Sequence, residues 1–386
     1  MNALMLSYLT NRTLIIPPIL VYRYPYNDPV YELYDKINEI IKIKKYRKDH
    51  CKNNSMDDNE KNSTFCKEEY SKDDKFTMIN VDQVFDFSEI KKHVRTVNRG
   101  YEITLDSLLR NFNFSQNDTR FFIENSEVHR YDIRIYDTDN STEPLYDYGT
   151  KLLLSDLLKI DKKLLHFGSL FNPTYKKPTN DSKLFYNPYR IVLDRKENVK
   201  FHRFIRDNLM INNSKVLNVS DRIIHELGRE GSYSGLHIRV GDEWYLSNKS
   251  ITTNEKYDSL MKELQKMNIK IRRKKKFFSY NLKNCLKNNL TIVFISTDSN
   301  NPRKDFKIFY RNIPCVFTLF DFEKELKILD NSFSDYDKNI DLKNFYTSLV
   351  DLLTAAYGKI FIGTERSTFS DMAYEIHRLH INNRNK

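Results

Sequence analysis

The sequence predicts an α/β fold in which a parallel sheet is wrapped by helices. The main sign lies in the second half of the chain, where short apolar runs alternate with longer segments of helical periodicity. A second sign lies at the start, where a helix-like stretch, a turn and an apolar run ending in two prolines follow one another. Because parallel strands need crossover connections, which are usually helices, this alternation favours a parallel sheet.

Residues 1–190 are predicted to form the first of two domains. In order, they are expected to contain a helix at 3–9, a buried strand at 13–18, helices at 88–97 and 104–112, an exposed-face strand at 131–136, and a helix, or a helix followed by a strand, within 152–165. The polar stretch 43–75 is predicted to be an insertion loop. Residues 175–190, rich in Pro, Asn and Lys, are predicted to be a linker.

Residues 191–386 are predicted to form the second domain, and their pattern is clearer. Strands are expected at 233–240, 290–296, 314–319 and 359–363. Helices are expected at 199–212, 219–227, 260–267, 305–311, 342–357 and 370–379. A chain of 386 residues is long enough for two domains of ordinary size.

The composition is that of a folded, basic protein. Hydrophobic residues make up 40% of the chain and aromatic residues 13%, which is enough for a sizeable core. The net charge of +11 favours an anionic ligand or surface, but the lysines are spread widely and mixed with Asp and Asn. The one dense basic run, 271–276, is predicted to be solvated. Because no nucleic-acid module is recognisable, we expect no nucleic-acid partner.

The cysteines and glycosylation motifs bear on the compartment. None of the four cysteines forms a C-x-x-C pair, so no zinc site is expected. A disulfide fits Cys51 and Cys66, whereas Cys285 and Cys315 form either a disulfide or two buried thiols. Asn-x-Ser/Thr motifs exceed chance for this composition, which favours the lumen of the endoplasmic reticulum or Golgi. They begin at Asn11, Asn53, Asn62, Asn113, Asn117, Asn140, Asn180, Asn212, Asn218, Asn248 and Asn289.

The start of the chain looks like the interior of a domain. Residues 1–9 are apolar but lack the basic leading region and the small-residue cleavage site of a signal peptide. No stretch is long and apolar enough to span a membrane. We therefore expect a chain that begins inside a domain, which leaves open whether a membrane anchor precedes it. If the preceding segment carries no signal, the protein is cytoplasmic.

Polar residues follow three of the predicted strands, at the edge where open α/β sheets bind ligands. The first strand ends in His237, Arg239 and Asp242, and residues 237 and 239 lie on the same side of a strand. Arg239 is either part of a structural ion pair or a contact for a diphosphate. Its permanent charge and forked N–H groups suit phosphate oxygens, and a departing diphosphate needs such charge.

The other two strands end in residues that complement Arg239. Asp298 is either an acceptor for a ribose hydroxyl or a guanine N–H edge, or the N-cap of the following helix. The third strand leads into Gly363-Thr-Glu-Arg-Ser-Thr-Phe-Ser370, where Ser367 or Thr368 is expected to cap the next helix. Free backbone N–H groups at such a helix start suit a phosphate.

Two further features have competing interpretations. Asp137-Thr-Asp139 has the D-x-D form that many metal-dependent sugar transferases use, but its Asn/Ser/Thr surroundings favour a solvated turn. No metal site is therefore assigned. Trp244 either forms the floor of a sugar or peptide site or belongs to the core.

Four segments together resemble the GDP-fucose protein O-fucosyltransferases. They are Leu9-Thr-Asn-Arg-Thr-Leu-Ile-Ile-Pro-Pro18, His237-Ile-Arg-Val-Gly-Asp-Glu-Trp244, Thr297-Asp-Ser299 and Ser367-Thr-Phe-Ser370, in the family's order. The resemblance is scattered between residues 3 and 375 and is weak at 40–130. The family's glycine-rich first motif, which ends in Asn-Gln, is expected just before Met1 and is absent from this chain.

The resemblance implies a GT-B fold, with two Rossmann-like domains and a nucleotide sugar between them. It implies inverting, metal-independent transfer of fucose from GDP-fucose, without a cofactor, to a Ser or Thr hydroxyl of a protein. Arg239 would contact the diphosphate as the catalytic residue, and His237 and Asp298 the guanosine. Ser367, Thr368, Phe369 and Ser370 would hold phosphates and fucose, and Asp242 and Thr364 would complete the sugar-donor site. The alternatives are a glycan acceptor, or an inactive protein that binds GDP-sugars.

Overall fold

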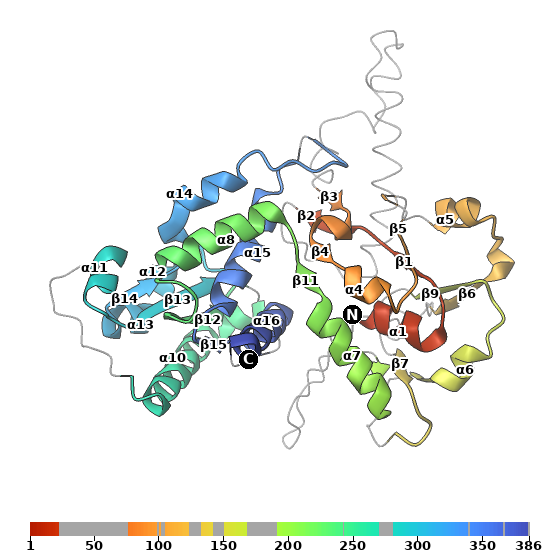
Figure 1. The fold of residues 1–386 in the computed structure, drawn as a ribbon, viewed down its shortest axis with the longest axis horizontal. Helices are drawn as coiled ribbons and strands as arrows, with labels where there is room; N and C mark the ends of the chain where they lie inside the picture. Colours follow the sequence, from red (N-terminus) through yellow and green to blue (C-terminus); the bar gives the residue numbers. More distant parts are fainter. Residues whose placement is uncertain are drawn as a thin grey trace, which may run out of the picture. The chain divides into compact units, whose positions relative to one another are not determined.

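The computed structural model describes most of the chain, and it divides into two compact units. The described residues are 1–22, 76–98, 100–101, 105–122, 133–141, 150–167, 191–241, 243–269, 281–338, 340–365 and 367–384. The first unit comprises Met1–Met210 and Phe333–Ile340, and the second comprises Ile211–Ser332 and Asp341–Lys386. Figure 1 labels most of the helices and strands of both units. The predicted insertion loop, the linker, Cys51, Cys66 and the basic run 271–276 lie outside the described residues.

The second unit is built on a four-stranded parallel sheet, so the α/β class predicted from the sequence is confirmed. Its strands are β12 (Tyr233–Ile238), β13 (Ile292–Thr297), β14 (Cys315–Phe317) and β15 (Ile360–Ile362). They lie in the order β14-β13-β12-β15. The chain adds β13 and β14 on one side of β12 and then returns to add β15 on the other. The strand order therefore reverses beside β12, and such reversals are where open α/β sheets bind ligands.

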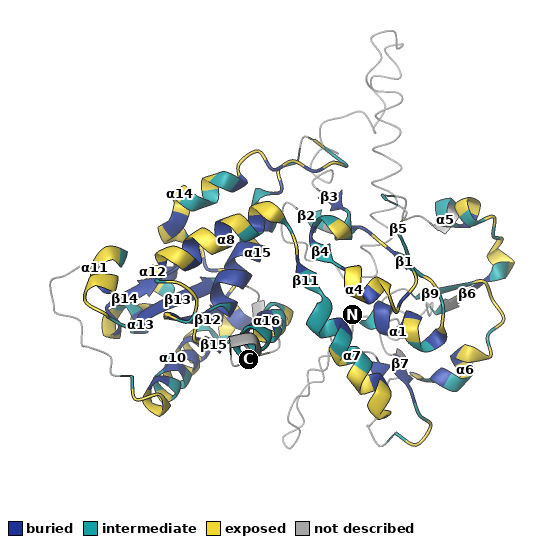
Figure 2. Cartoon of the chain, in the orientation of Figure 1, coloured by how far each residue is buried: buried dark blue, intermediate teal, exposed yellow. Residues whose placement is uncertain are grey.

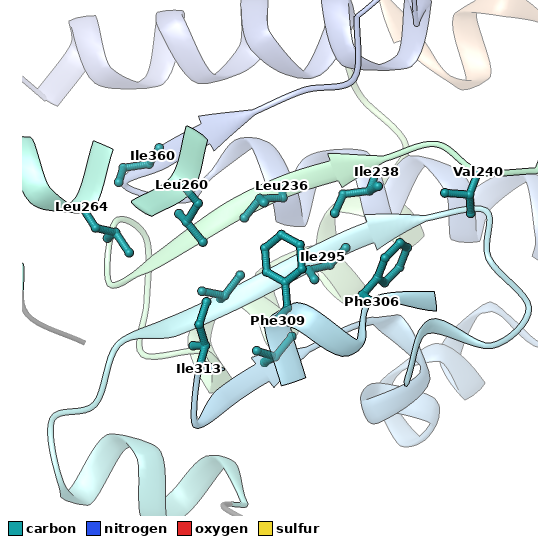
Figure 3. Packing of buried hydrophobic residues seen from close by; sticks show 12 residues of the cluster. Leu236, Ile238, Val240, Leu260, Leu264, Ile295, Phe306, Phe309, Ile313 and Ile360 are labelled. Carbon is teal, nitrogen blue, oxygen red and sulfur yellow. The ribbon is translucent and has the colours of Figure 1, made fainter. Parts of the chain in front are cut away.

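Helices cover both faces of this sheet. The described α-helices of this unit are α8 (Ser214–Glu226), α9 (Glu243–Ser247), α10 (Lys249–Lys266), α11 (Leu282–Lys287), α12 (Pro302–Asp305), α13 (Lys307–Asn312), α14 (Glu323–Leu326), α15 (Lys343–Ala356) and α16 (Thr368–Arg384). Alternate residues of β12 face opposite sides. Leu236 and Ile238 pack with residues of α10 and α13 (Figure 3). On the other face, α15 contacts β12, β13, α8 and α16.

The first unit contains smaller sheets, most of them parallel. Its strands are β1 (Leu14–Ile16), β2 (Ile19–Tyr22), β3 (Phe76–Ile79), β4 (Phe85–Asp86), β5 (Thr96–Asn98), β6 (Thr119–Phe122), β7 (Ile133–Tyr136), β8 (Thr150–Leu153), β9 (Leu164–Phe167) and β10 (Ile191–Val192). Parallel pairs form between β1 and β5, between β6 and β9, and from β7 to both β8 and β10, whereas β2 and β3 are antiparallel. The short strand β11 (Met210–Ile211) lies in the sequence where the first unit gives way to the second.

The α-helices that the structure describes among these strands are α1 (Asn2–Thr10), α4 (Ser88–Lys91), α5 (Leu105–Phe112), α6 (Leu154–Leu158) and α7 (Lys196–Asn208). The core of the unit includes Met5, Ile90, Ile135 and Ile205, which are fully buried. Figure 2 colours buried residues dark blue, and α1 and β7 contain such residues. Because α1 contributes Leu4, Met5 and Leu6 to this core, the apolar start of the chain is part of it, as the sequence predicts.

Two local expectations for the first unit are wrong. Residues 88–97 do not form one helix, because α4 ends at Lys91 and Thr96–Asn98 is strand β5, paired with β1. Strand β7 does not have an exposed face. Arg134, Ile135 and Tyr136 are all buried, since β7 lies between β8 and β10. A central strand is covered on both faces, which its polar and apolar alternation did not reveal.

A disulfide joins Cys285 of α11 to Cys315 of β14, with Cα atoms 6.1 Å apart. The structure thus decides between the two alternatives that the sequence left open for this pair. The bond closes a loop of 30 residues. In the chain-entropy model, a closure of that size stabilises the fold by about 3–4 kcal/mol. Among the helices that the structure describes, none is both long and apolar enough to cross a membrane.

Gly235 tests how tightly β12 packs on α15. A Cβ atom at this position would lie 1.9 Å from the carbonyl oxygen of Ala355, which is backbone and cannot rotate away. We expect Gly235→Ala to lower the free energy of unfolding by about 3 kcal/mol, because β12 and α15 must separate. Ser234→Ala is the control, because Ser234 immediately precedes Gly235 in the same strand and is also buried. Equal urea midpoints for the two variants would show that the packing is looser than described.

Candidate functional site at the carboxyl ends of the strands

The register of the sheet brings three predicted site segments to one edge. Ile238, the last residue of β12, pairs with Thr297, the last residue of β13. On the other side of β12, Leu236 pairs with Ile362, so His237 and Gly363 come next along the two strands. Arg239, Asp298 and Thr364 therefore all follow strand ends at the point where the strand order reverses. This neighbourhood was predicted from the sequence, and the structure brings these three segments together.

Asp298 binds the backbone that leaves β12. Its carboxylate accepts hydrogen bonds from the N–H groups of Val240 at 2.7 Å and Gly241 at 3.0 Å. A Cβ atom at residue 241 would lie 2.6 Å from Oδ2 of Asp298, so glycine is required for this approach. The N-cap alternative for Asp298 is wrong, because Asn301 caps α12 by accepting from the N–H of Lys304. Asp298 is exposed, and its contact with a guanosine stays a prediction.

A second set of hydrogen bonds ties β12 to the segment after β15. The Thr364 hydroxyl donates to the carbonyl of His237 at 2.7 Å and accepts from the N–H of Arg239 at 3.1 Å. The Ser370 hydroxyl accepts from the N–H of Thr364 at 2.8 Å and bonds Nδ1 of His237 at 2.7 Å. These hydroxyl groups already bond within the protein. Their position fixes Arg239, and their direct contact with a sugar donor stays a prediction.

His237 is buried and uncharged. Burial lowers the pKa of its imidazole to about 3, and the positive charges of Arg239 and Lys256 add to the effect. The ring centroid lies 4.3 Å from that of Phe369, which is half-buried. A neutral imidazole in this place adds no positive charge to the site. Arg239 therefore stands beside a polar but uncharged neighbour.

Arg239 is half-buried and held over an aromatic ring. Its guanidinium carbon lies 5.3 Å from the ring centroid of Tyr245, in α9. The Tyr245 hydroxyl donates to the carbonyl of Glu365 at 2.9 Å, which anchors the ring to the segment after β15. A guanidinium on an aromatic face keeps its charge and loses little freedom on binding a ligand. Sequence reasoning missed Tyr245, although an aromatic residue shortly after the Arg239 segment was a usable signal.

The start of α16 lies at the same edge. Ser367 is fully buried, its hydroxyl lies 3.5 Å from the N–H of Ser370, and its carbonyl accepts from Asp371. This places Ser367 at the cap position that the sequence predicted. Thr368, the first residue of the helix, is exposed. The first N–H groups of a helix lack partners within it and carry partial positive charge, which suits an anion beside Arg239.

A buried carboxyl beneath the site was also missed. Asp351 of α15 accepts from the Ser296 hydroxyl at 2.6 Å and from the N–H of Thr297 at 3.2 Å, both through Oδ2. Its Oδ1 has no hydrogen-bond partner among the described residues. Burial raises the pKa of Asp351 to about 7, and the charge of Asp298 adds to this. A single acid within the apolar stretch 342–357 was the sequence signal.

The remaining predicted residues have mixed outcomes. Trp244 lies in α9, but its side chain is not described, and Asp242 lies outside the described residues. The solvated-turn interpretation is wrong for Asp137, which is buried and accepts from the N–H of Asp194 at 2.9 Å and from Asn198 at 2.8 Å. It thereby supports the start of α7 in the first unit. Within the described ranges, no three His, Cys, Asp or Glu side chains are grouped to hold a metal ion.

Comparison with known proteins assigns the chain to a family. The model of the GDP-fucose protein O-fucosyltransferase family matches residues 1–380. The chain belongs to this family. It is therefore an enzyme of the fucosyltransferase type, and the resemblance in the sequence motifs is confirmed. No individual curated protein matches it.

Solved structures give weaker likenesses. One of POFUT1 in complex with GDP has a TM-score of 0.39 and 10% identity over 98% of this chain and 90% of that chain. One of POFUT1 in complex with GDP-fucose has a TM-score of 0.36 and 10% identity over 97% of this chain and 88% of that chain. These likenesses are too distant to place individual residues.

Asp298→Ala is expected to release the backbone after β12. Two N–H groups would lose their acceptor, which costs about 1–3 kcal/mol of stability. Amide hydrogen exchange at Val240 and Gly241 should accelerate strongly, while exchange in β12 stays slow. Asn300→Ala, an exposed change two residues away, is the control. Unchanged exchange at both amides in the Asp298 variant would contradict the described contact.

Asp351→Asn is expected to change how stability depends on pH. Because the folded-state pKa lies above the unfolded value of about 4, the contribution of Asp351 is fully present below pH 4 and is lost as pH rises through about 7. Asparagine imitates the neutral carboxyl and removes this loss. At pH 8 the variant should exceed the wild type in unfolding free energy by about 1–3 kcal/mol, and less at pH 5. Asp258→Asn, at an exposed position of α10, should show no such trend.

Proposed function

We propose that this protein transfers fucose from GDP-fucose to a Ser or Thr hydroxyl of a protein acceptor, with inversion at the anomeric carbon and without a metal ion. The observation that carries the proposal is the position of Arg239. It stands where the strand order reverses, on the ring of Tyr245, at the same sheet edge as the start of α16. Membership of the O-fucosyltransferase family supplies the reaction class.

The chemistry of transfer explains why this arrangement suits a nucleotide sugar. The bond between the anomeric carbon and the diphosphate oxygen breaks while the acceptor oxygen bonds the same carbon from the opposite face. The diphosphate gains negative charge as it leaves, and the acceptor hydroxyl gives up its proton. Arg239 and the first N–H groups of α16 would stabilise the diphosphate, since both present positive charge before the reaction begins. Thr368 and Phe369 would border the phosphates and the sugar.

The site residues that bond within the protein have a positioning role in this proposal. Thr364 and Ser370 hold the backbone on either side of Arg239, and Asp298 holds the two residues that follow it. Asp298 and His237 would lie on the guanosine side, Asp242 would belong to the sugar-donor site, and Trp244 would lie on the acceptor side. A fixed backbone means that little reorganisation is needed when the diphosphate forms.

The architecture and compartment complete the proposal. We place the protein among GT-B enzymes, with Rossmann-like domains at 1–190 and 191–386. We place it in the lumen of the endoplasmic reticulum or Golgi. The disulfide between Cys285 and Cys315 supports an oxidising compartment. The excess of Asn-x-Ser/Thr motifs points the same way.

Arg239→Ala tests the proposal. We expect transfer from GDP-fucose to fall at least about 100-fold, because the leaving diphosphate loses its cation. Arg239→Lys should restore little, since an ammonium group cannot donate to two oxygens in a fork. Circular dichroism should be unchanged in both variants. Arg222→Ala, an exposed arginine on α8, is the control and should transfer at the wild-type rate.

The same assay distinguishes the acceptors. Folded protein domains with exposed Ser or Thr, free glycans and water are offered in parallel, and labelled fucose is followed in each. Transfer to glycans alone would replace the protein acceptor in the proposal. Tight GDP binding without transfer or hydrolysis would indicate an inactive GDP-sugar-binding protein. Wild-type turnover by Arg239→Ala would contradict the assignment of the diphosphate site.

A further inference from the structure

The turn between α11 and β13 carries the motif Asn289-Leu290-Thr291. Asn289 is exposed and has a φ of 48°, in the left-handed region. Its N–H donates to the carbonyl of Leu286 at 3.0 Å, and the N–H of Leu290 donates to that of Cys285 at 3.0 Å. This pair of bonds ends a helix on a left-handed residue, a place that asparagine occupies more readily than most residues. The motif is thus held on a tight, exposed turn.

The two polar side chains of the motif, those of Asn289 and Thr291, are available for a modifying enzyme. Neither the carboxamide of Asn289 nor the hydroxyl of Thr291 has a hydrogen-bond partner within the described ranges. The motif that begins at Asn218 differs in this respect. The Asn218 carboxamide accepts from Nε of Arg222 at 2.9 Å, and the Ser220 hydroxyl is buried and donates to the carbonyl of Val216.

The disulfide provides an independent observation at the same turn. Cys285, four residues before Asn289, is bonded to Cys315. Disulfides persist in oxidising compartments, and the secretory lumen is the compartment in which Asn-x-Ser/Thr motifs are glycosylated. The motif therefore lies close to a disulfide that indicates the secretory lumen, the compartment in which N-glycosylation takes place.

A group attached to this turn would not block the candidate site. Asn289 precedes β13, whereas Asp298 follows it, and β13 has six residues. At about 3.3 Å per residue, the strand separates the two ends by about 20 Å. All four strands are parallel, so a group on Asn289 lies at the amino edge of the sheet and the site at its carboxyl edge.

We propose that Asn289 carries an N-linked glycan. In this step Nδ2 of Asn289 bonds the anomeric carbon of an oligosaccharide, which leaves a lipid-linked diphosphate donor, and the amide nitrogen loses one proton. The glycan covers the turn between α11 and β13 beside the disulfide. This modification goes beyond the transfer reaction proposed above and does not depend on it.

The test uses the full chain secreted from a eukaryotic host. Peptides covering residue 289 are analysed by mass spectrometry before and after an amidase that converts glycosylated asparagine to aspartate. We expect the wild type and Thr291→Ser to carry the glycan, and Asn289→Asp and Thr291→Ala to lack it. Aspartate also tolerates the left-handed conformation, so Asn289→Asp should remain folded.

Asn268 provides a matched control. It is exposed, has a φ of 56° and ends α10 with the same two backbone bonds, but Ile269 and Lys270 follow it, without a hydroxyl. Asn268→Asp should leave the glycan on Asn289 unchanged. Unmodified Asn289 in a secreted chain that is glycosylated at another motif would overturn the proposal. Because fucose transfer is assayed separately, that outcome would leave the proposed function standing.

Discussion

The two hydrogen bonds from the N–H groups of Val240 and Gly241 to the carboxylate of Asp298 determine where the chain goes after β12. Because Asp298 directly follows β13, these hydrogen bonds hold the backbone after β12 beside the end of β13. Gly241 is part of the same constraint, since a side chain there would meet the carboxylate. Thr364 fixes the other end of the turn by bonding the backbone on both sides of Ile238. Arg239 stands between these two attachments, so its backbone position is set by neighbours on both sides.

Most polar groups of this region bond one another, and that shapes its electrostatics. Ser370 and Thr364 use their hydroxyl groups on the backbone and on His237, while burial keeps His237 neutral. Burial drives the carboxyl of Asp351 towards its neutral form as well. The arrangement thus distinguishes structural polar groups, which hold the backbone or are kept neutral by burial, from the half-buried cation of Arg239. Such a division favours binding an anion with little rearrangement.

The strongly periodic parts of the sequence predicted their structure well, and the locally ambiguous parts did not. Strands β12, β13 and β15 were predicted because each is an apolar run followed by polar residues, and their parallel pairing then places Arg239, Asp298 and Thr364 together. What Asp298 binds could not be predicted, since its partners are backbone groups 57 and 58 residues away. Asp137 was misjudged for a similar reason. Its burial depends on β10 and α7, which arrive more than 50 residues later in the chain. When a polar residue has turn-forming neighbours, the local sequence does not show that a distant segment will bury it and bond to it.

The short strand β14 is a weak point of the sheet, and the disulfide protects it. It has three residues and pairs with β13 on one side, and among the described strands none pairs with its other side, which is therefore an edge. An unpaired edge offers backbone groups to which another chain can add a strand. The disulfide between Cys285 and Cys315 attaches this strand covalently to α11, which precedes β13 in the sequence. Loss of β14 would expose β13, a longer and wholly apolar template, over Ile292–Ile295. In a reducing environment, the protein would therefore be at risk of aggregating through its own sheet.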